Sequence, residues 1–222
     1  TLCVTLPIHQ VQAQVDRAGE HVRRLTERYS NAEAPHADLT AAYDAFAGSF
    51  APSLVQGAGK GVADLAGANA RSRLRMTALY YFAGLNNLLV VGTGNKIEDF
   101  GVGFFTKYGD GGVDISPIAD LTKTEVYELG RWLGVPEAIL AAPPTDGLFG
   151  DDRTDEQQIG ATYPELERAM AHAERGTDPA LLSGREREVY DIFLRRNRAN
   201  RHKMEPIPVC RIPRHLVEPA GR

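Results

Sequence analysis

The segment LLVVGTGNKIEDFGVGFFTKYGDGGVDISPIADLTKTE, residues 88–125, decides the fold prediction for this chain. It begins with four apolar residues, 88–91, which predict a short buried strand. A passage rich in glycines, lysines and carboxylates follows this strand. Open α/β sheets bind ligands beyond the carboxyl ends of their strands, where a glycine-rich turn offers N–H groups to phosphate and acids can hold Mg²⁺. The segment therefore predicts a nucleotide site.

Helices and strands alternate around this segment. Residues 2–6 form a second apolar, β-rich run, and the apolar spacing over 11–29 predicts an amphipathic helix after it. A further helix is predicted over 39–50, and another over 69–85 leads into strand 88–91. Alternation of this kind is typical of the parallel α/β class.

Beyond residue 121 the sequence predicts a helical C-terminal part. Capping patterns occur at Thr122–Glu125, Thr154–Gln157 and Ser183–Glu186, and a further helix is predicted over Pro164–Glu174. Residues 141–155 carry prolines, glycines and aspartates without periodicity, so they predict a long loop that acts as a lid. The proline-rich tail after residue 205 is expected to be extended.

Composition limits the classes of protein. The chain has 222 residues, 43% hydrophobic and 24% charged, which is ordinary for a soluble globular protein with one large domain or at most two small ones. We expect a single domain over residues 1–222. A net charge of −4 argues against a nucleic-acid partner. No apolar run approaches the roughly 20 residues of a membrane helix, and the first residues lack the features of a signal peptide. The two cysteines, Cys3 and Cys210, lie in apolar stretches and predict reduced, buried thiols in a cytoplasmic protein.

Residues 90–136, VVGTGNKIEDFGVGFFTKYGDGGVDISPIADLTKTEVYELGRWLGVP, resemble the central region of the NAD synthetases. The resemblance extends to NARSRLRM at 69–76, APPTDGL at 142–148 and RHK at 201–203. It implies a parallel-sheet, Rossmann-like fold of the adenine nucleotide alpha hydrolase type. It also implies a cytoplasmic homodimer that uses Mg²⁺ and ATP. In this family ATP adenylates the carboxylate of deamido-NAD with loss of pyrophosphate, and ammonia then displaces AMP to form NAD.

The resemblance also implies roles for individual residues, although each of them could instead be an ordinary solvated side chain. No residue is assigned to acid–base or nucleophilic catalysis, because such a reaction depends mostly on positioning and charge neutralisation. ATP would be contacted by Thr93, Lys123 and Thr145, Mg²⁺ by Glu98, and deamido-NAD by Arg73, Lys107, Asp114, His202 and Lys203.

The chain departs from the family at one important point. The family's Ser-Gly-Gly-x-Asp-Ser signature, which cradles the ATP pyrophosphate, occurs nowhere in the sequence. Since TLCVTLP resembles the family's second strand, we expect the signature to lie before Thr1, with a natural short form as the alternative. A non-catalytic nucleotide-binding module and a ligase for another acid are the alternative functions. The GTGNK sequence leaves ammonia and glutamine open as nitrogen donors.

Overall fold

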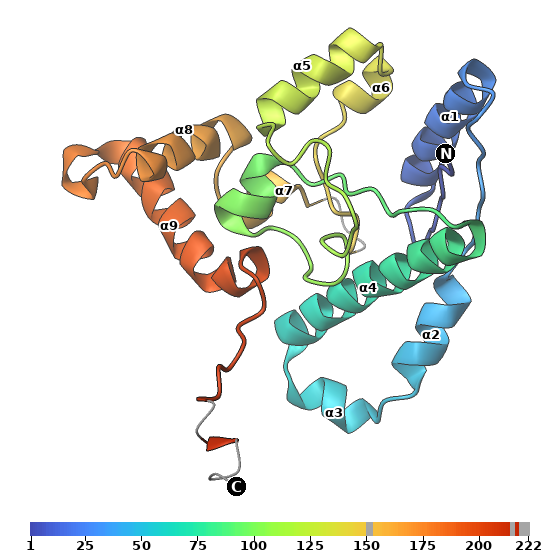
Figure 1. The fold of residues 1–222 in the computed structure, drawn as a ribbon, viewed down its shortest axis with the longest axis horizontal. Coiled ribbons are helices and arrows are strands. Elements are labelled where there is room, and N and C mark those ends of the chain that lie inside the picture. Colours follow the sequence, from blue (N-terminus) through green and yellow to red (C-terminus); the bar gives the residue numbers. More distant parts are fainter. Residues whose placement is uncertain (150–152, 214–215, 218–222) are drawn as a thin grey trace, which may run out of the picture.

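The computed structural model describes residues 1–149, 153–213 and 216–217. Helices make up most of the described chain (Figure 1). In chain order they are α1 (Gln12–Arg28), α2 (Thr40–Gly48), α3 (Pro52–Gly57), α4 (Lys60–Asn86), the π-helix η1 (Ile97–Val102), α5 (Lys123–Leu133), α6 (Glu137–Leu140), α7 (Asp155–Ile159), α8 (Tyr163–Glu174), the 3₁₀-helix η2 (Pro179–Leu181) and α9 (Gly184–Met204).

The structure contains two pairs of extended segments, and in each pair the two segments are parallel. Residues 1–7 pair with 33–39 through backbone hydrogen bonds such as Cys3 N to Glu33 O at 2.8 Å, and Val90 accepts from Asp114 N at 2.9 Å. The parallel direction agrees with the prediction, but each bridge is isolated, and no hydrogen bond joins the two pairs within the described residues. An extended parallel sheet is therefore not shown, and the prediction of a buried strand at 88–91 is wrong for Leu89 and Val91, whose side chains are mostly exposed.

The largest buried core lies where α8, α9 and η1 meet. Leu166 of α8 and both Ile97 and Val102 of η1 are fully buried there, and Phe193 of α9 packs with them. Figure 1 shows α8 and α9 at one end of the molecule, and the long α4 with α2 and α3 at the other. The segments between these two helical groups, residues 91–121 and 141–149, carry most of the predicted site.

The C-terminal half of α9 fixes the segment that follows η1. Asn197 Nδ2 donates to Gly101 O at 2.8 Å, Asn200 Nδ2 to Val102 O at 2.8 Å, and Lys203 Nζ to Gly103 O at 2.9 Å. These three side chains recur every three residues, so they share one face of the helix. One helix thus contributes to the core with its first half and anchors residues 101–103 with its second.

Threonine caps fix several helix starts. Thr122 and Thr154 each form the reciprocal capping box that their spacing predicts, and Thr162 forms a third box that sequence reasoning missed. The predicted cap at Ser183 is wrong, because its side chain makes no capping hydrogen bond. The chain enters α9 through Gly184 at a left-handed φ of 53°, so the usual cap geometry does not form.

The amphipathic helix predicted over 11–29 is confirmed as α1, although none of its side chains is fully buried, and Leu133 of α5 is about half exposed. The prediction of two buried thiols is wrong. Both cysteines are free, but only Cys3 is partly buried, because Cys210 lies in the exposed extended tail. Among the described residues, no helix is long and apolar enough to span a bilayer.

Candidate functional site

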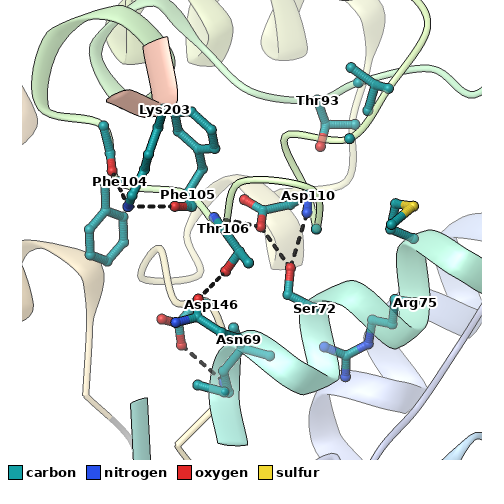
Figure 2. Close-up of a pocket in the computed structure, with 18 of the residues that line it drawn as sticks. Asn69, Ser72, Arg75, Thr93, Phe104, Phe105, Thr106, Asp110, Asp146 and Lys203 are labelled. Atoms are coloured by element: carbon teal, nitrogen blue, oxygen red, sulfur yellow. Dashed lines mark hydrogen bonds between the residues drawn. The ribbon is translucent and has the colours of Figure 1, made fainter. Parts of the chain in front are cut away.

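A cavity of about 720 Å³ lies between α4, residues 91–113, the loop at 146–149 and the end of α9. Figure 2 shows Asn69, Ser72 and Arg75 entering from α4, with Thr93 and Lys203 from other segments. Two of the predicted site residues, Thr93 and Lys203, line this cavity. Its volume lies within the range of small-molecule and cofactor sites.

A hydrogen-bond network fastens the TKYGDGG loop, residues 106–112, to α4. Ser72 Oγ donates to Asp110 Oδ1 at 2.7 Å and accepts from Asp110 N at 3.0 Å, while Thr106 Oγ1 donates to Asn69 Oδ1 at 2.6 Å (Figure 2). A Cβ on Gly109 would lie 2.2 Å from Ser72 Oγ, so only glycine allows this close approach. Sequence reasoning missed this network, because nothing in either segment signals a pairing across 38 positions.

Lys203 enters the cavity from α9 and is held by main-chain oxygens. Its Nζ donates to Gly103 O at 2.9 Å and to Phe105 O at 2.8 Å (Figure 2). Burial lowers the pKa of Lys203, an effect that the charge of Asp110 partly offsets. Both of these hydrogen-bond partners are neutral carbonyls, so neither of them offsets the charge of the ammonium.

Three further predicted residues meet beside the cavity. Arg73 Nε donates to Lys107 O at 3.2 Å, and Lys107 Nζ donates to the carbonyl oxygen of His202. The side chains of Arg73 and His202 are exposed, and none of the three residues lines the cavity itself. These contacts to main-chain oxygens bring Arg73 and Lys107 next to His202, and the two cations suit phosphate or carboxylate.

Glu98 and Lys123 form an ion pair that the sequence did not predict. Lys123 Nζ lies 2.9 Å from Glu98 Oε1, and the two side chains are only 20% and 15% exposed. The Tyr163 hydroxyl donates to the same oxygen at 2.5 Å, and the Lys123 ammonium lies 4.8 Å from the centre of the Tyr163 ring. Burial and the charge of Glu98 raise the pKa of Tyr163, so its hydroxyl remains a donor at ordinary pH.

The fit of this cluster to Mg²⁺ is partial. No group of three histidine, cysteine or acidic side chains able to hold a metal occurs in the described part of the chain. Asp155 is near, since its Oδ2 accepts from Tyr163 at 3.4 Å, but it is buried and its Oδ1 has no hydrogen-bond partner. The cluster fits an ion that arrives already bound to phosphate, because Mg²⁺ needs only one or two protein carboxylates in such sites.

Asp114 and Thr145 are not brought together with the other predicted residues. The Asp114 carboxylate accepts from Tyr80 Oη at 3.0 Å and from Val90 N at 2.8 Å, so in this structure it stabilises strand pairing. Thr145 Oγ1 accepts from Gly147 N at 3.2 Å and donates to Arg153 O at 3.0 Å within its own loop. Residues 150–152 of the predicted lid lie outside the described residues.

We expect Asp155→Asn to stabilise the protein at pH 7.5. Burial, with the charges of Asp146 and Glu98, raises the pKa of Asp155 to about 6, above its usual value of 3.8. Between these values the folded state holds a proton that the unfolded state releases, so stability falls as pH rises through 6. Asp155→Asn should raise the free energy of unfolding by about 2 to 3 kcal/mol at pH 7.5 and leave it almost unchanged at pH 4. Urea unfolding at the two pH values measures this difference.

Asp191→Asn is the matched control, because Asp191 pairs with Arg187 at 2.9 Å on the exposed surface. It should change stability by no more than about 0.5 kcal/mol at either pH. A loss of stability in Asp155→Asn at pH 7.5 would contradict the prediction and mean that the ionised carboxylate is stabilising.

Comparison with known proteins identifies the family. The family model described as NAD synthase matches residues 1–207. The NH(3)-dependent NAD(+) synthetase of Carboxydothermus hydrogenoformans is 45% identical over 139 residues, 63% of this chain and 52% of that protein. That of Alkaliphilus metalliredigens is 54% identical over 100 residues, 45% of this chain and 40% of that protein.

Solved structures agree with the family match. An NMN synthetase from Francisella tularensis superimposes with a TM-score of 0.74 at 31% identity, covering 94% of this chain and 78% of that chain. The NH3-dependent NAD synthetase of Campylobacter jejuni, at a TM-score of 0.67 and 22% identity, shares the fold over 94% of this chain and 76% of that chain. The chain spans about half the length of the curated relatives that it matches. Since the family model covers nearly all of its residues, this chain belongs to the NAD synthase family.

Proposed function

We propose that the protein containing this chain is a ligase that forms NAD from deamido-NAD, ATP and ammonia. The observation that carries the proposal is the arrangement of cations around the cavity. Lys203 lines the cavity, and Arg73 and Lys107 lie beside it with His202. Such a concentration of positive charge suits the pyrophosphate and carboxylate of an acidic dinucleotide. Ammonia as nitrogen donor is supported by the names of the relatives.

The proposed reaction has two steps. The nicotinate carboxylate of deamido-NAD attacks the α-phosphorus of ATP, which forms an acyl-adenylate and releases pyrophosphate. Ammonia then attacks the acyl carbon, AMP leaves with the bonding electrons, and the nitrogen loses a proton. The first step brings a carboxylate against a polyanionic phosphate chain, so charge neutralisation and alignment are the main needs. Lys123 would supply positive charge to the ATP phosphates, with Thr93 and Thr145 as further contacts.

Mg²⁺ is proposed as the cofactor, brought to Glu98 by the ATP phosphates. Its chemistry is to neutralise phosphate charge. The support is chemical, since a hard cation prefers carboxylate and phosphate oxygens and keeps several waters. Asp114 is proposed as a further contact to deamido-NAD. We also propose that the chain forms one domain over residues 1–222, that its paired segments belong to a parallel sheet, and that the protein is a cytoplasmic homodimer.

A second candidate is the formation of NMN from the corresponding acid mononucleotide. The observation that favours it is the similarity to the Francisella tularensis NMN synthetase over 94% of this chain. The two functions share the chemistry of the carboxylate and differ only in the adenylate half of the substrate. They are therefore separated by substrate choice alone.

The test is a measurement of AMP and pyrophosphate release by the protein expressed from its whole gene. Reactions contain MgATP, either deamido-NAD or nicotinate mononucleotide, and either ammonium chloride or glutamine. We expect equal amounts of AMP and NAD with deamido-NAD and ammonium, and no AMP without the acid substrate. Substrate binding without AMP release would favour a non-catalytic binding module. AMP release with nicotinate mononucleotide but not with deamido-NAD would favour NMN synthesis.

A further inference from the structure

The Tyr163 side chain contacts both members of the Glu98–Lys123 pair. Its hydroxyl donates to Glu98 Oε1 at 2.5 Å, and its ring lies under the Lys123 ammonium at 4.8 Å. The hydrogen bond is not required for the ring to pack, because phenylalanine would fill the same space in the core and keep the contact with Lys123. The hydroxyl therefore has a use beyond burial.

The three side chains come from three different elements. Glu98 lies on η1, Lys123 is the first residue of α5, and Tyr163 is the first residue of α8. Tyr163 is 3% exposed and belongs to the core of α8, α9 and η1, so its ring has little freedom to move. It is the rigid member of the trio, whereas glutamate and lysine are long and flexible.

Lys123 needs such support because of where it lies. A helix N-terminus favours anions and disfavours cations, and Lys123 occupies the first turn of α5. Glu98 supplies the compensating charge, but a flexible carboxylate alone does not fix the direction of the ammonium. The ring of Tyr163 adds a cation–π contact from a fixed position. Its hydroxyl orients the carboxylate with a charge-assisted hydrogen bond.

We propose that Tyr163 is a positioning residue, which holds the Glu98 carboxylate and the Lys123 ammonium in the arrangement that receives the ATP phosphates. The role in the reaction rests on the proposed function, whereas the contact between Tyr163 and Glu98 does not. Tyr163 itself does not touch the reacting atoms. It acts through Glu98 and Lys123, and its effect falls on turnover rather than on binding of the dinucleotide.

Tyr163→Phe tests the proposal, with Tyr190→Phe as the matched control. Tyr190 is equally buried in the same core, and its hydroxyl makes one long hydrogen bond of 3.4 Å to Thr177 O, away from Glu98. Both variants lose one hydroxyl and keep the ring. In the whole protein we expect Tyr163→Phe to lower kcat for AMP release about 10-fold, with KM for the acid substrate changed less than about 2-fold. Tyr190→Phe should change kcat less than about 2-fold.

A second measurement is independent of enzymatic activity. The urea midpoint of unfolding is compared for Tyr163→Phe in the parent and in a Glu98→Met background, which removes the acceptor oxygen. We expect the shift caused by Tyr163→Phe to be much smaller in the Glu98→Met background, whereas the shift caused by Tyr190→Phe stays the same in both.

Each failure has a different meaning. If the unmutated protein releases no AMP, the proposed function fails, and the midpoints still decide whether Tyr163 and Glu98 are coupled. Equal shifts for Tyr163→Phe in both backgrounds would overturn the proposal. So would equal kcat values for Tyr163→Phe and Tyr190→Phe. Where a double variant does not fold, the kcat comparison decides alone.

Discussion

Replacing Lys123 by methionine in the whole protein is expected to lower the rate of AMP release by about 10²–10³-fold, the usual effect of losing one group that stabilises transition-state charge. Lys123 carries the ammonium closest to Glu98, at 2.9 Å, and methionine keeps a similar length without the charge. The rate of AMP release at saturating MgATP and acid substrate measures the effect. Lys123→Arg should restore part of the rate, because it restores the charge with a different donor geometry.

Lys96→Met is the control for this prediction. Lys96 pairs with Glu174 at 3.3 Å on a more exposed surface, and such pairs contribute about 0 to 1 kcal/mol. Its loss should leave the rate within about 2-fold. Circular dichroism must first establish that Lys123→Met is folded, because it leaves Glu98 partly buried without its cation. A folded Lys123→Met protein with the parent's rate would remove Lys123 from the proposed ATP site.

Replacing Leu166 by alanine is expected to destabilise the protein by about 2 to 5 kcal/mol, as for other fully buried leucines. Leu166 is 0% exposed at the centre of the core of α8, α9 and η1. It lies one turn after Tyr163 on the same helix, so the cavity left by alanine would also loosen the Glu98–Lys123–Tyr163 contacts. The measurement is urea unfolding followed by circular dichroism.

Leu181→Ala provides the comparison, because Leu181 on η2 is 79% exposed. It should cost less than about 0.5 kcal/mol. Leu166→Met, which nearly conserves volume, should cost less than about 1.5 kcal/mol. If Leu166→Ala and Leu181→Ala had equal effects, the core of α8, α9 and η1 would not be the main source of stability.

Local signals predicted the helices well. The Thr122–Glu125 and Thr154–Gln157 spacings gave correct helix starts, because a capping box is formed by residues that are neighbours in the chain. Val189 and Phe193 are four residues apart on α9, as an apolar helix face requires, and both lie in the core. The helix expected over 11–29 is also confirmed as α1, but nothing in the sequence states what covers its apolar face, and none of its side chains is fully buried.

The site was predicted as a set of residues, not as an arrangement. Thr93 and Lys203 line one cavity, and Glu98 pairs with Lys123, but this pairing depends on how η1 and α5 approach each other in the fold. Tyr163, 65 positions away from Glu98, was not singled out at all. A buried tyrosine in an amphipathic helix resembles any core residue until its hydroxyl is seen to have a partner.

The face of α9 that carries Asn197, Asn200 and Lys203 has a consequence for how this protein can evolve. These side chains reach the successive carbonyl oxygens of residues 101–103 only if their angular position around the helix axis, relative to Phe193, is kept. One inserted residue between Phe193 and Asn197 would rotate everything after it by about 100° around the helix axis. Substitutions on the outer face of α9 should therefore be tolerated during evolution, whereas insertions and deletions of single residues within the helix should not.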